Sequence, residues 1–289
     1  MAIDKRQVRR SFGQAAAHYD RVAVLQHDIG QRLLERLDYV RLQPERILDL
    51  GCGTGRHTAA LLRRYPQAEV IGLDFAWPMV QQTCRQRVHW RRRVRGMCAD
   101  LEQLPLAAHS VDLIFSNAAL QWCRDPRVAF AEMQRILRPD GLVLFTSFGP
   151  DTLFELRQAW LQCDTQPRVH TFRDMHDYGD QLLQSRLLDP VMDCERITMT
   201  YPQVSDILRE LKLLGATYAA HERRRGLTGR AQLNALAAAY EVYRRADGSL
   251  PVTYEVIYGH AWAGEMASAQ PSAVQVPLDT LTRRQKATS

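Results

Sequence analysis

A glycine loop between an apolar strand and a helix is the feature of this sequence with the clearest chemical potential. Three glycines at two-residue spacing follow the apolar run 47–50, namely Gly51, Gly53 and Gly55. Glycine permits positive φ and lets a ligand approach the backbone closely. The nicotinamide fingerprint G-x-G-x-x-G needs a further glycine at position 56, which is Arg56 here. With Asp49 two residues before the first glycine, the loop is expected to bind another cofactor.

Polar side chains follow the next strands along the chain. The second strand ends in Asp74, whose carboxylate is suited to accept both hydroxyls of a ribose. The alternative for Asp74 is an N-cap of the helix that begins near Pro78. The third strand ends in Asp100 and Leu101, where a carboxylate and a backbone N–H suit the edge of an adenine ring. Asn117 follows the fourth strand, beside the switch point where open parallel sheets bind ligands.

Short apolar runs alternate with amphipathic segments between residues 45 and 148, and this pattern predicts the elements that position these side chains. We expect strands at 47–50, 69–73, 94–98, 111–116 and 142–147. We expect helices at 57–65, 78–87 and 126–137. Such alternation predicts a doubly wound, mostly parallel α/β sheet with helices on both faces.

The pattern divides the chain into five regions. Residues 1–44 carry apolar positions at helical spacing, which predicts one or two N-terminal helices that cover the cleft. Residues 45–202 form the core, 251–263 supply its final strand, and 203–250 are expected to form a helical cap between them. Residues 264–289 are rich in Ala, Ser, Gln and Pro without periodicity, which predicts a disordered tail.

Four motifs occur in a fixed order along the core. They are Asp49 to Gly55, Asp74, Asp100 with Leu101, and Arg138-Pro139-Asp140-Gly141. Together they resemble the class I S-adenosylmethionine-dependent methyltransferase family, and the resemblance covers roughly residues 45–148. It implies S-adenosylmethionine as the cofactor. It also implies that the glycine loop contacts the methionine part, Asp74 the ribose, and Asp100 with Leu101 the adenine.

The flanks of this core carry further motifs. They are Arg10-Ser11-Phe12-Gly13-Gln14-Ala15-Ala16, Tyr19-Asp20, Gln26, Ala119-Leu120-Gln121-Trp122, Phe148-Gly149-Pro150, Thr152-Leu153, Glu155-Leu156-Arg157 and Pro251-Val252-Thr253-Tyr254. These motifs resemble the malonyl-acyl-carrier-protein O-methyltransferases of biotin synthesis. That family methylates the free carboxylate of a malonyl thioester on acyl carrier protein, so that fatty-acid enzymes elongate the resulting methyl ester.

The chemistry implied by this resemblance needs no general base, because a carboxylate with a pKa of about 4 is already ionised at neutral pH. What remains is to hold the carboxylate oxygen in line with the sulfonium methyl group. The candidates for this task are Tyr19 and Gln26 from the N-terminal helices and Trp122 after the fourth strand. An aromatic face also favours the sulfonium. For all three residues, packing in the core is the alternative.

Positive charge is concentrated in two arginine runs. The formal net charge is +6, and the runs lie within residues 85–95 and at residues 223–225. Such runs suit an acidic partner such as the carrier protein, whose encounter they would accelerate. A solvated surface without a partner is the alternative. Nucleic acid is not expected, because Asn117-Ala118-Ala119-Leu120 lacks the Asn/Asp-Pro-Pro-aromatic tetrad of base-amino methyltransferases.

Several other classes of protein are not expected. The chain meets charge at once, at residues 4–6, which is unlike a secretory signal. No apolar run approaches the roughly 20 residues that span a bilayer, so we expect a cytoplasmic protein without membrane association. The six cysteines form no C-x-x-C pair, and His170 and His176 are interpreted as capping and surface residues, so no metal is expected.

A protein of the same fold with another function is an alternative. Residues 151–157 and 246–251 also resemble the mitochondrial complex I assembly factors, which are linked to arginine hydroxylation of a subunit. The N-terminal residues 11–13, with Tyr19 and Gln26, favour the malonyl enzyme. A cofactor-binding protein without activity is the third possibility.

Overall fold

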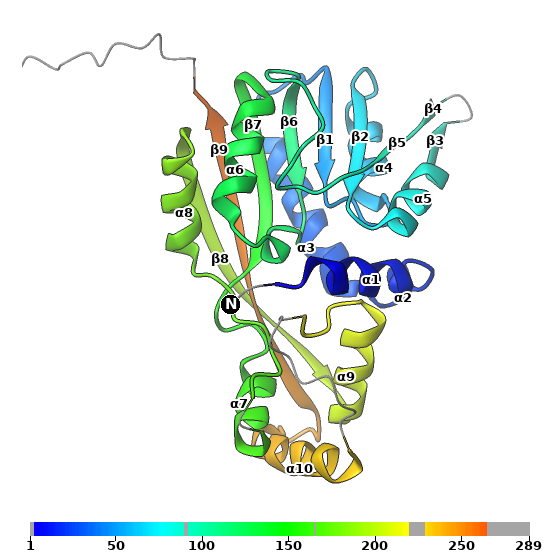
Figure 1. Cartoon of the computed structure of the whole chain (residues 1–289), viewed down its shortest axis with the longest axis vertical. Coiled ribbons are helices and arrows are strands. Elements are labelled where there is room, and N and C mark those ends of the chain that lie inside the picture. The colour runs from blue at the N-terminus through cyan, green and yellow to red at the C-terminus, as the bar shows by residue number, and fades with distance from the viewer. Residues whose placement is uncertain (1–2, 90–91, 165, 220–228, 265–289) are drawn as a thin grey trace, which may run out of the picture.

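A seven-stranded sheet forms the centre of the computed structural model, which describes residues 3–89, 92–164, 166–219 and 229–264 (Figure 1). The parallel strands are β1 (Arg46–Leu50), β2 (Glu69–Asp74), β5 (Arg95–Cys98), β6 (Val111–Ser116) and β7 (Leu137–Phe148). β9 (Leu250–Ala263) pairs antiparallel with β7, and β8 (Leu187–Tyr201) pairs antiparallel with β9 at the edge. The order β5-β2-β1-β6-β7-β9-β8 confirms the predicted doubly wound, mostly parallel α/β fold.

The central strands are apolar on both faces because helices cover both sides of the sheet. In β6, Leu113 and Phe115 join one core cluster, whereas Ile114 between them joins the other. The helices that cover the sheet are α3 (Val24–Glu35), α4 (Arg56–Arg64), α5 (Trp77–Arg85), α6 (Pro126–Ile136) and α8 (Met175–Gln184). α3 and α4 pack in the first cluster, and α6 and α8 pack in the second.

The N-terminal segment is more broken than the one or two helices predicted. Besides α3 it forms α1 (Lys5–Ala15), α2 (Tyr19–Val22) and the 3-10 helix η1 (Arg36–Tyr39). The side chain of Asp4 caps α1 by accepting a hydrogen bond from the Gln7 N–H at 3.1 Å. Figure 1 shows α1 and α2 lying across the carboxyl ends of the parallel strands.

A helical group lies at the far end of the β8–β9 ribbon. The ribbon continues beyond the core as far as the pair Tyr201 and Leu250. The helices packed at this end are α7 (Phe154–Cys163), α9 (Val204–Leu213), α10 (Arg230–Tyr240) and the 3-10 helix η3 (Glu241–Tyr243) (Figure 1). Because α7 packs on α10, we include it in the proposed cap with residues 203–250. The proposed tail after Gly264 lies outside the described residues.

Two small elements complete the fold. The strands β3 (Arg87–His89) and β4 (Arg92–Arg93) form a hairpin before β5. The 3-10 helix η2 (Leu120–Trp122) follows β6 at the carboxyl end of the sheet. η2 therefore brings its residues to the same end as the glycine loop.

Candidate active site

The loop after β1 has three glycines with positive φ. The angles are 78° at Gly51, 55° at Gly53 and 84° at Gly55. A Cβ at Gly51 would lie 2.3 Å from the Cβ of Ala119, so the close approach of the residue before η2 requires glycine there. A Cβ at Gly53 would have only Tyr19 near it, at 4.0 Å. Gly51 and Gly53 line a small cavity of about 60 Å³ between the loop, β2 and α1.

Asp74 ends β2, lines the same cavity and is 8% exposed. Its Oδ1 accepts a hydrogen bond from the Ala76 N–H at 2.8 Å, and its Oδ2 accepts one from the Gly53 N–H at 3.1 Å. The carboxylate therefore braces both the start of α5 and the glycine loop. Because a carboxylate has about four acceptor sites, it keeps capacity for ligand hydroxyls. Burial raises the pKa of Asp74 to about 6.

Two of the predicted cofactor residues do not line the small cavity: Asp49 lies within β1, and Gly55 ends the loop at the start of α4. Asp49 is 2% exposed and accepts a hydrogen bond from the Thr58 hydroxyl at 2.5 Å. Burial raises the pKa of Asp49 to about 7. A Cβ at Gly55 would lie 2.8 Å from the Cα of Thr83. Both residues shape the loop from its inner side.

Asp100, Leu101 and Asn117 also line the small cavity. Both carboxylate oxygens of Asp100 accept hydrogen bonds from the Lys5 ammonium, at 2.7 and 2.6 Å, and Lys5 also forms an ion pair with Glu102. Since Lys5 begins α1, these contacts hold α1 across the cavity. Sequence reasoning missed Lys5 because it is 95 residues from Asp100, with no local pattern to link them.

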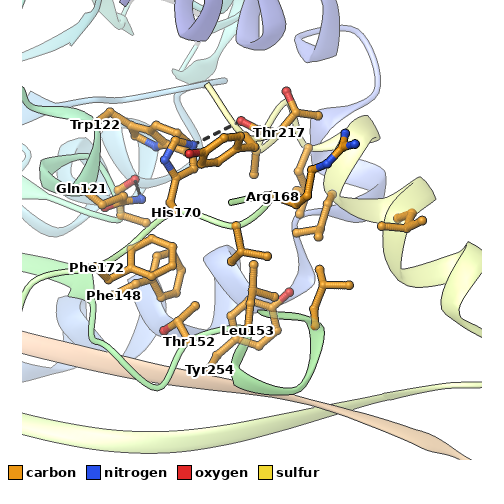
Figure 2. A pocket seen from close by; sticks show the side chains of 18 of the residues that line it. Gln121, Trp122, Phe148, Thr152, Leu153, Arg168, His170, Phe172, Thr217 and Tyr254 are labelled. Carbon is orange, nitrogen blue, oxygen red and sulfur yellow. Dashed lines mark hydrogen bonds between the residues drawn. The ribbon is translucent and has the colours of Figure 1, made fainter. Parts of the chain in front are cut away.

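A larger cavity of about 340 Å³ adjoins the small one. The residues that line both are Phe12, Tyr19, Ala118 and Trp122. Figure 2 shows the larger cavity enclosed by side chains of the sheet, the cap and the loop before α8. Its apolar lining includes Phe148, Leu153, Trp160, Phe172 and Tyr254. A group bound in one cavity would meet a group bound in the other at the shared wall.

The structure brings the three predicted catalytic residues together at the larger cavity. Burial raises the pKa of the Tyr19 hydroxyl, which stays protonated at neutral pH and is available as a donor. The Gln26 carbonyl accepts a hydrogen bond from the Asn117 amide at 2.8 Å, while Gln26 Oε1 is buried without a partner among the described residues. The Trp122 ring lies edge-on to Phe12, with ring centroids 5.3 Å apart.

Several residues of the larger cavity were missed at the level of sequence, including Gln121, Arg168 and His170. The interpretation of His170 as a capping or surface residue is wrong, because the loop between α7 and α8 places it in the cavity wall. His170 Nε2 accepts a hydrogen bond from the Ala219 N–H at 3.0 Å, and its ring lies edge-on to Trp122 at 5.3 Å. Burial lowers the pKa of His170, so the imidazole is neutral.

The remaining observations concern His176, grouped metal ligands and membrane-spanning helices. His176 lies at the surface, with Nδ1 2.7 Å from Asp174 Oδ1. Within the described ranges, no three His, Cys, Asp or Glu side chains are grouped so as to hold a metal ion. Across those same residues, no helix combines the length and apolar character needed to cross a bilayer.

Known proteins similar to this chain carry consistent names. A family profile described as a methyltransferase domain matches residues 48–145. The chain is 50% identical over 277 residues to the malonyl-[acyl-carrier protein] O-methyltransferase of Methylovorus sp. (strain MP688), covering 94% of this chain and 93% of that one. It is 51% identical over 262 residues to the protein of the same name from Halorhodospira halophila, covering 90% and 88%.

A solved structure provides a comparison of folds. Phosphoethanolamine N-methyltransferase 2 of Haemonchus contortus, in complex with phosphomonomethylethanolamine and S-adenosylhomocysteine, aligns with a TM-score of 0.53 at 14% identity. The alignment covers 82% of this chain and 53% of that one, and it supports the methyltransferase fold. The two sequence relatives, in contrast, match this chain over about nine-tenths of its length and of their own. The chain therefore belongs to the malonyl-[acyl-carrier protein] O-methyltransferase family.

Proposed function

We propose that this protein transfers a methyl group from S-adenosylmethionine to the free carboxylate of a malonyl thioester on acyl carrier protein. The product is the methyl ester from which biotin synthesis starts. The observation that carries the proposal is the pair of adjoining cavities with Tyr19 and Trp122 in their common wall. The names of the relatives point to the same substrate.

The residues of the small cavity suit the cofactor. The glycine loop offers close backbone approach to the methionine part and Asp74 offers acceptors for the ribose, and we assign Asp100 with Leu101, which line the same cavity, to the adenine. Bound there, S-adenosylmethionine supplies an electrophilic methyl group on its sulfonium. The volume of about 60 Å³ is below the roughly 300–1,000 Å³ of typical ligand sites. We therefore expect α1, with Lys5, to open for entry of the cofactor and to close over it again once it is bound.

Orientation is the chain's main contribution to the reaction. The malonyl carboxylate is ionised at neutral pH and is already a nucleophile. Tyr19 stays protonated and donates a hydrogen bond that fixes one carboxylate oxygen, and the Gln26 amide is placed to hold the carboxylate from the same cavity. Holding the oxygen in line with the methyl group converts binding energy into rate.

The larger cavity supplies a dry environment for the transfer. Its aromatic and aliphatic lining keeps water from the reacting groups and strengthens the few polar contacts. The Trp122 ring borders both cavities, where an aromatic face favours the sulfonium. The catalytic roles of Tyr19, Gln26 and Trp122 are thus positioning contacts to substrate and cofactor.

Charge is proposed to guide the carrier protein. Of the two predicted arginine runs, residues 223–225 lie outside the described residues, and Arg95 of the other run forms an ion pair with Glu69. Turnover of malonyl-carrier should fall with added salt, whereas turnover of a small malonyl thioester should not. Replacing residues 223–225 by alanine should raise the KM for the carrier substrate. An unchanged KM at low salt would place the docking surface elsewhere.

The proposal includes a cytoplasmic location, because all six cysteines carry free thiols, as expected where the cytosol keeps thiols reduced. The alternative of a complex I assembly factor is not favoured, since relatives at 50% and 51% identity carry the methyltransferase name.

Growth without biotin tests the proposed function. Expression of this protein in a bacterial strain that lacks its own malonyl-carrier methyltransferase should restore growth on biotin-free medium. The Asp74→Ala variant should not restore it, and added biotin should rescue every strain. If the wild-type chain accumulates as a folded protein and growth still requires biotin, the proposed function is wrong.

A further inference from the structure

A third cavity lies on the other side of the wall formed by Gln121, His170 and Phe172. It has a volume of about 240 Å³, and these three residues line both it and the larger cavity. Figure 2 shows Gln121 and Phe172 at one side of the larger cavity, opposite Arg168. The third cavity in turn shares Arg124, Arg173 and Asp177 with a surface groove of about 460 Å³. Three side chains therefore separate the proposed malonyl site from a route to the surface.

Two arginines without an ion-pair partner in the described ranges lie where the third cavity meets the surface groove, whose lining also includes Arg127 and the carboxylates of Asp125, Asp177 and Asp180. Arg124 and Arg173 line the third cavity and are exposed, and neither forms an ion pair with a described residue. Asp177 is the carboxylate that lines the same cavity, so two guanidinium groups face one negative charge. The neighbouring Arg127 differs, because it is paired with Asp125 at 2.7 Å. Arg124 and Arg173 are thus available for an external anion such as a phosphate.

The wall between the third cavity and the larger one offers one acceptor and one donor. Gln121 donates its Nε2 hydrogen to the Ala118 carbonyl at 2.6 Å, which leaves Oε1 buried with no partner in the described part of the chain. A buried acceptor without a partner costs free energy, so a ligand N–H there is favoured. His170 Nε2 lies 3.0 Å from the Ala219 N–H, which can only donate, and 3.4 Å from the Thr217 carbonyl oxygen, so the shorter contact favours the tautomer with its proton on Nδ1 as a donor. This pair complements the N–H and C=O of a secondary amide.

Among the described residues, the opposite end of the larger cavity has no comparable anion site. Arg168 lines it, but its guanidinium is bound to the Asp164 carboxylate at 2.6 Å, and the two side chains are only 15% and 9% exposed. The same guanidinium lies over the Trp160 ring, 5.2 Å from its centroid. Its charge is therefore already neutralised within the protein.

We propose that the phosphopantetheine arm of the substrate enters through the third cavity, with its phosphate on Arg124 and Arg173 and an amide between Gln121 and His170. The inference rests on the proposed function, since it concerns the arm that carries the malonyl thioester. The arm has a phosphodiester at its outer end, amides along its length and a thioester at its inner end. From the surface inward, the structure offers in the same order the guanidinium groups, the wall that holds Gln121 and His170, and the proposed malonyl site.

Two small substrates isolate the role of the phosphate. Malonyl-pantetheine and malonyl-phosphopantetheine differ only in that group, and the KM of each is measured with the wild type and with the double variant Arg124→Ala/Arg173→Ala. The wild type should prefer the phosphorylated substrate by about tenfold in KM, as expected for exposed charge-assisted hydrogen bonds. The double variant should lose this preference, so that its two KM values converge.

A matched control keeps the net charge equal. Arg41→Ala/Arg63→Ala also removes two exposed arginines that form no ion pair with a described residue, but these precede β1 and end α4, at the opposite end of the sheet. This control should keep the tenfold preference. The conservative variant Arg124→Lys/Arg173→Lys should retain part of it, because lysine keeps the charge but not the planar fork.

The outcomes separate this inference from the proposed function. If the wild type methylates both substrates with equal KM, or if the double variant keeps the preference, phosphate is not bound at Arg124 and Arg173. If the wild type methylates neither substrate nor malonyl-carrier, the proposed function itself fails.

Discussion

Removing the carboxylate of Asp74 perturbs the proposed cofactor site most directly. In Asp74→Ala the ribose loses its acceptor, and the N–H groups of Gly53 and Ala76 lose theirs. The variant should therefore bind S-adenosylmethionine weakly and also unfold at a lower temperature.

The sizes of the losses in cofactor affinity and in folding stability follow from the hydrogen bonds that the Asp74 carboxylate accepts. A ribose offers two hydroxyls, and a hydrogen bond to a charged group contributes about 1.5 kcal/mol at the lower end of its range. Two such bonds amount to about 3 kcal/mol, which is roughly a 100-fold increase in Kd. The lost bonds to Gly53 and Ala76 should lower the free energy of unfolding by about 1–3 kcal/mol, since buried N–H groups are left without acceptors.

The pH dependence of binding has a sign set by the pKa of Asp74. Burial raises that pKa to about 6 in the free protein, and the ionised form accepts both hydroxyls. Affinity should thus be highest above pH 6 and should fall as the pH drops through that value, by up to about tenfold per pH unit. Asp49, whose pKa is raised to about 7 by burial, contacts Thr58 and remains in the variant. The charge of Asp74 also contributes to the raised pKa of Asp49, so Asp49 should titrate at a lower pH in Asp74→Ala, and the loss of the step near pH 6 reports on Asp74.

Isothermal titration calorimetry between pH 5 and 8 measures both effects. The control is Thr83→Val, which removes a 2.9 Å hydrogen bond from the Thr83 hydroxyl to the Gly53 carbonyl and leaves the carboxylate in place. It should lose stability but lose less than about tenfold in affinity. Equal Kd values for wild type and Asp74→Ala would remove Asp74 from the ribose site and refute the assignment.

Three further predictions concern the catalytic wall and the elements that cover it. Tyr19→Phe should lower kcat about tenfold while the cofactor Kd stays close to that of the wild type, because one donor to the carboxylate is lost; an unchanged kcat would contradict the role of Tyr19. Lys5→Ala removes the ion pairs to Asp100 and Glu102 and should speed release of S-adenosylhomocysteine in stopped-flow measurements, whereas an unaltered rate would show that α1 is not held by Lys5. Hydrogen exchange with bound cofactor and substrate should show protection in α1, α2 and α9, and protection confined to residues 45–120 would disprove closure by the N-terminal helices and cap.

The core could be predicted from sequence because its signals are local. Buried parallel strands appear as short apolar runs, and the glycines between β1 and α4 mark a turn that other residues adopt only under strain. The position of Asp74 at the carboxyl end of the sheet could be predicted because Asp74 directly ends the apolar run of β2. The helices α4, α5 and α6 could be predicted from the helical periodicity of the apolar residues between the strands.

The elements that complete the site depend on long-range contacts. No glycine or proline marks the breaks near His18 and Ala23 that separate α1, α2 and α3, so sequence reasoning predicted fewer helices. The hairpin β3–β4 lies in an arginine run without apolar alternation. His170 reaches the cavity only because the loop before α8 packs against Trp122 and the segment at Ala219.

Mass spectrometry of the carrier protein after reaction tests the central claim most directly. Malonyl-acyl carrier protein incubated with S-adenosylmethionine and this protein should gain one methyl group, and fragmentation should place it on the malonyl carboxylate. Acetyl-acyl carrier protein, which lacks a free carboxylate, should gain none. A carrier that remains unmethylated, or a methyl group found on the acetyl carrier as well, would contradict carboxyl methylation as the activity of this protein.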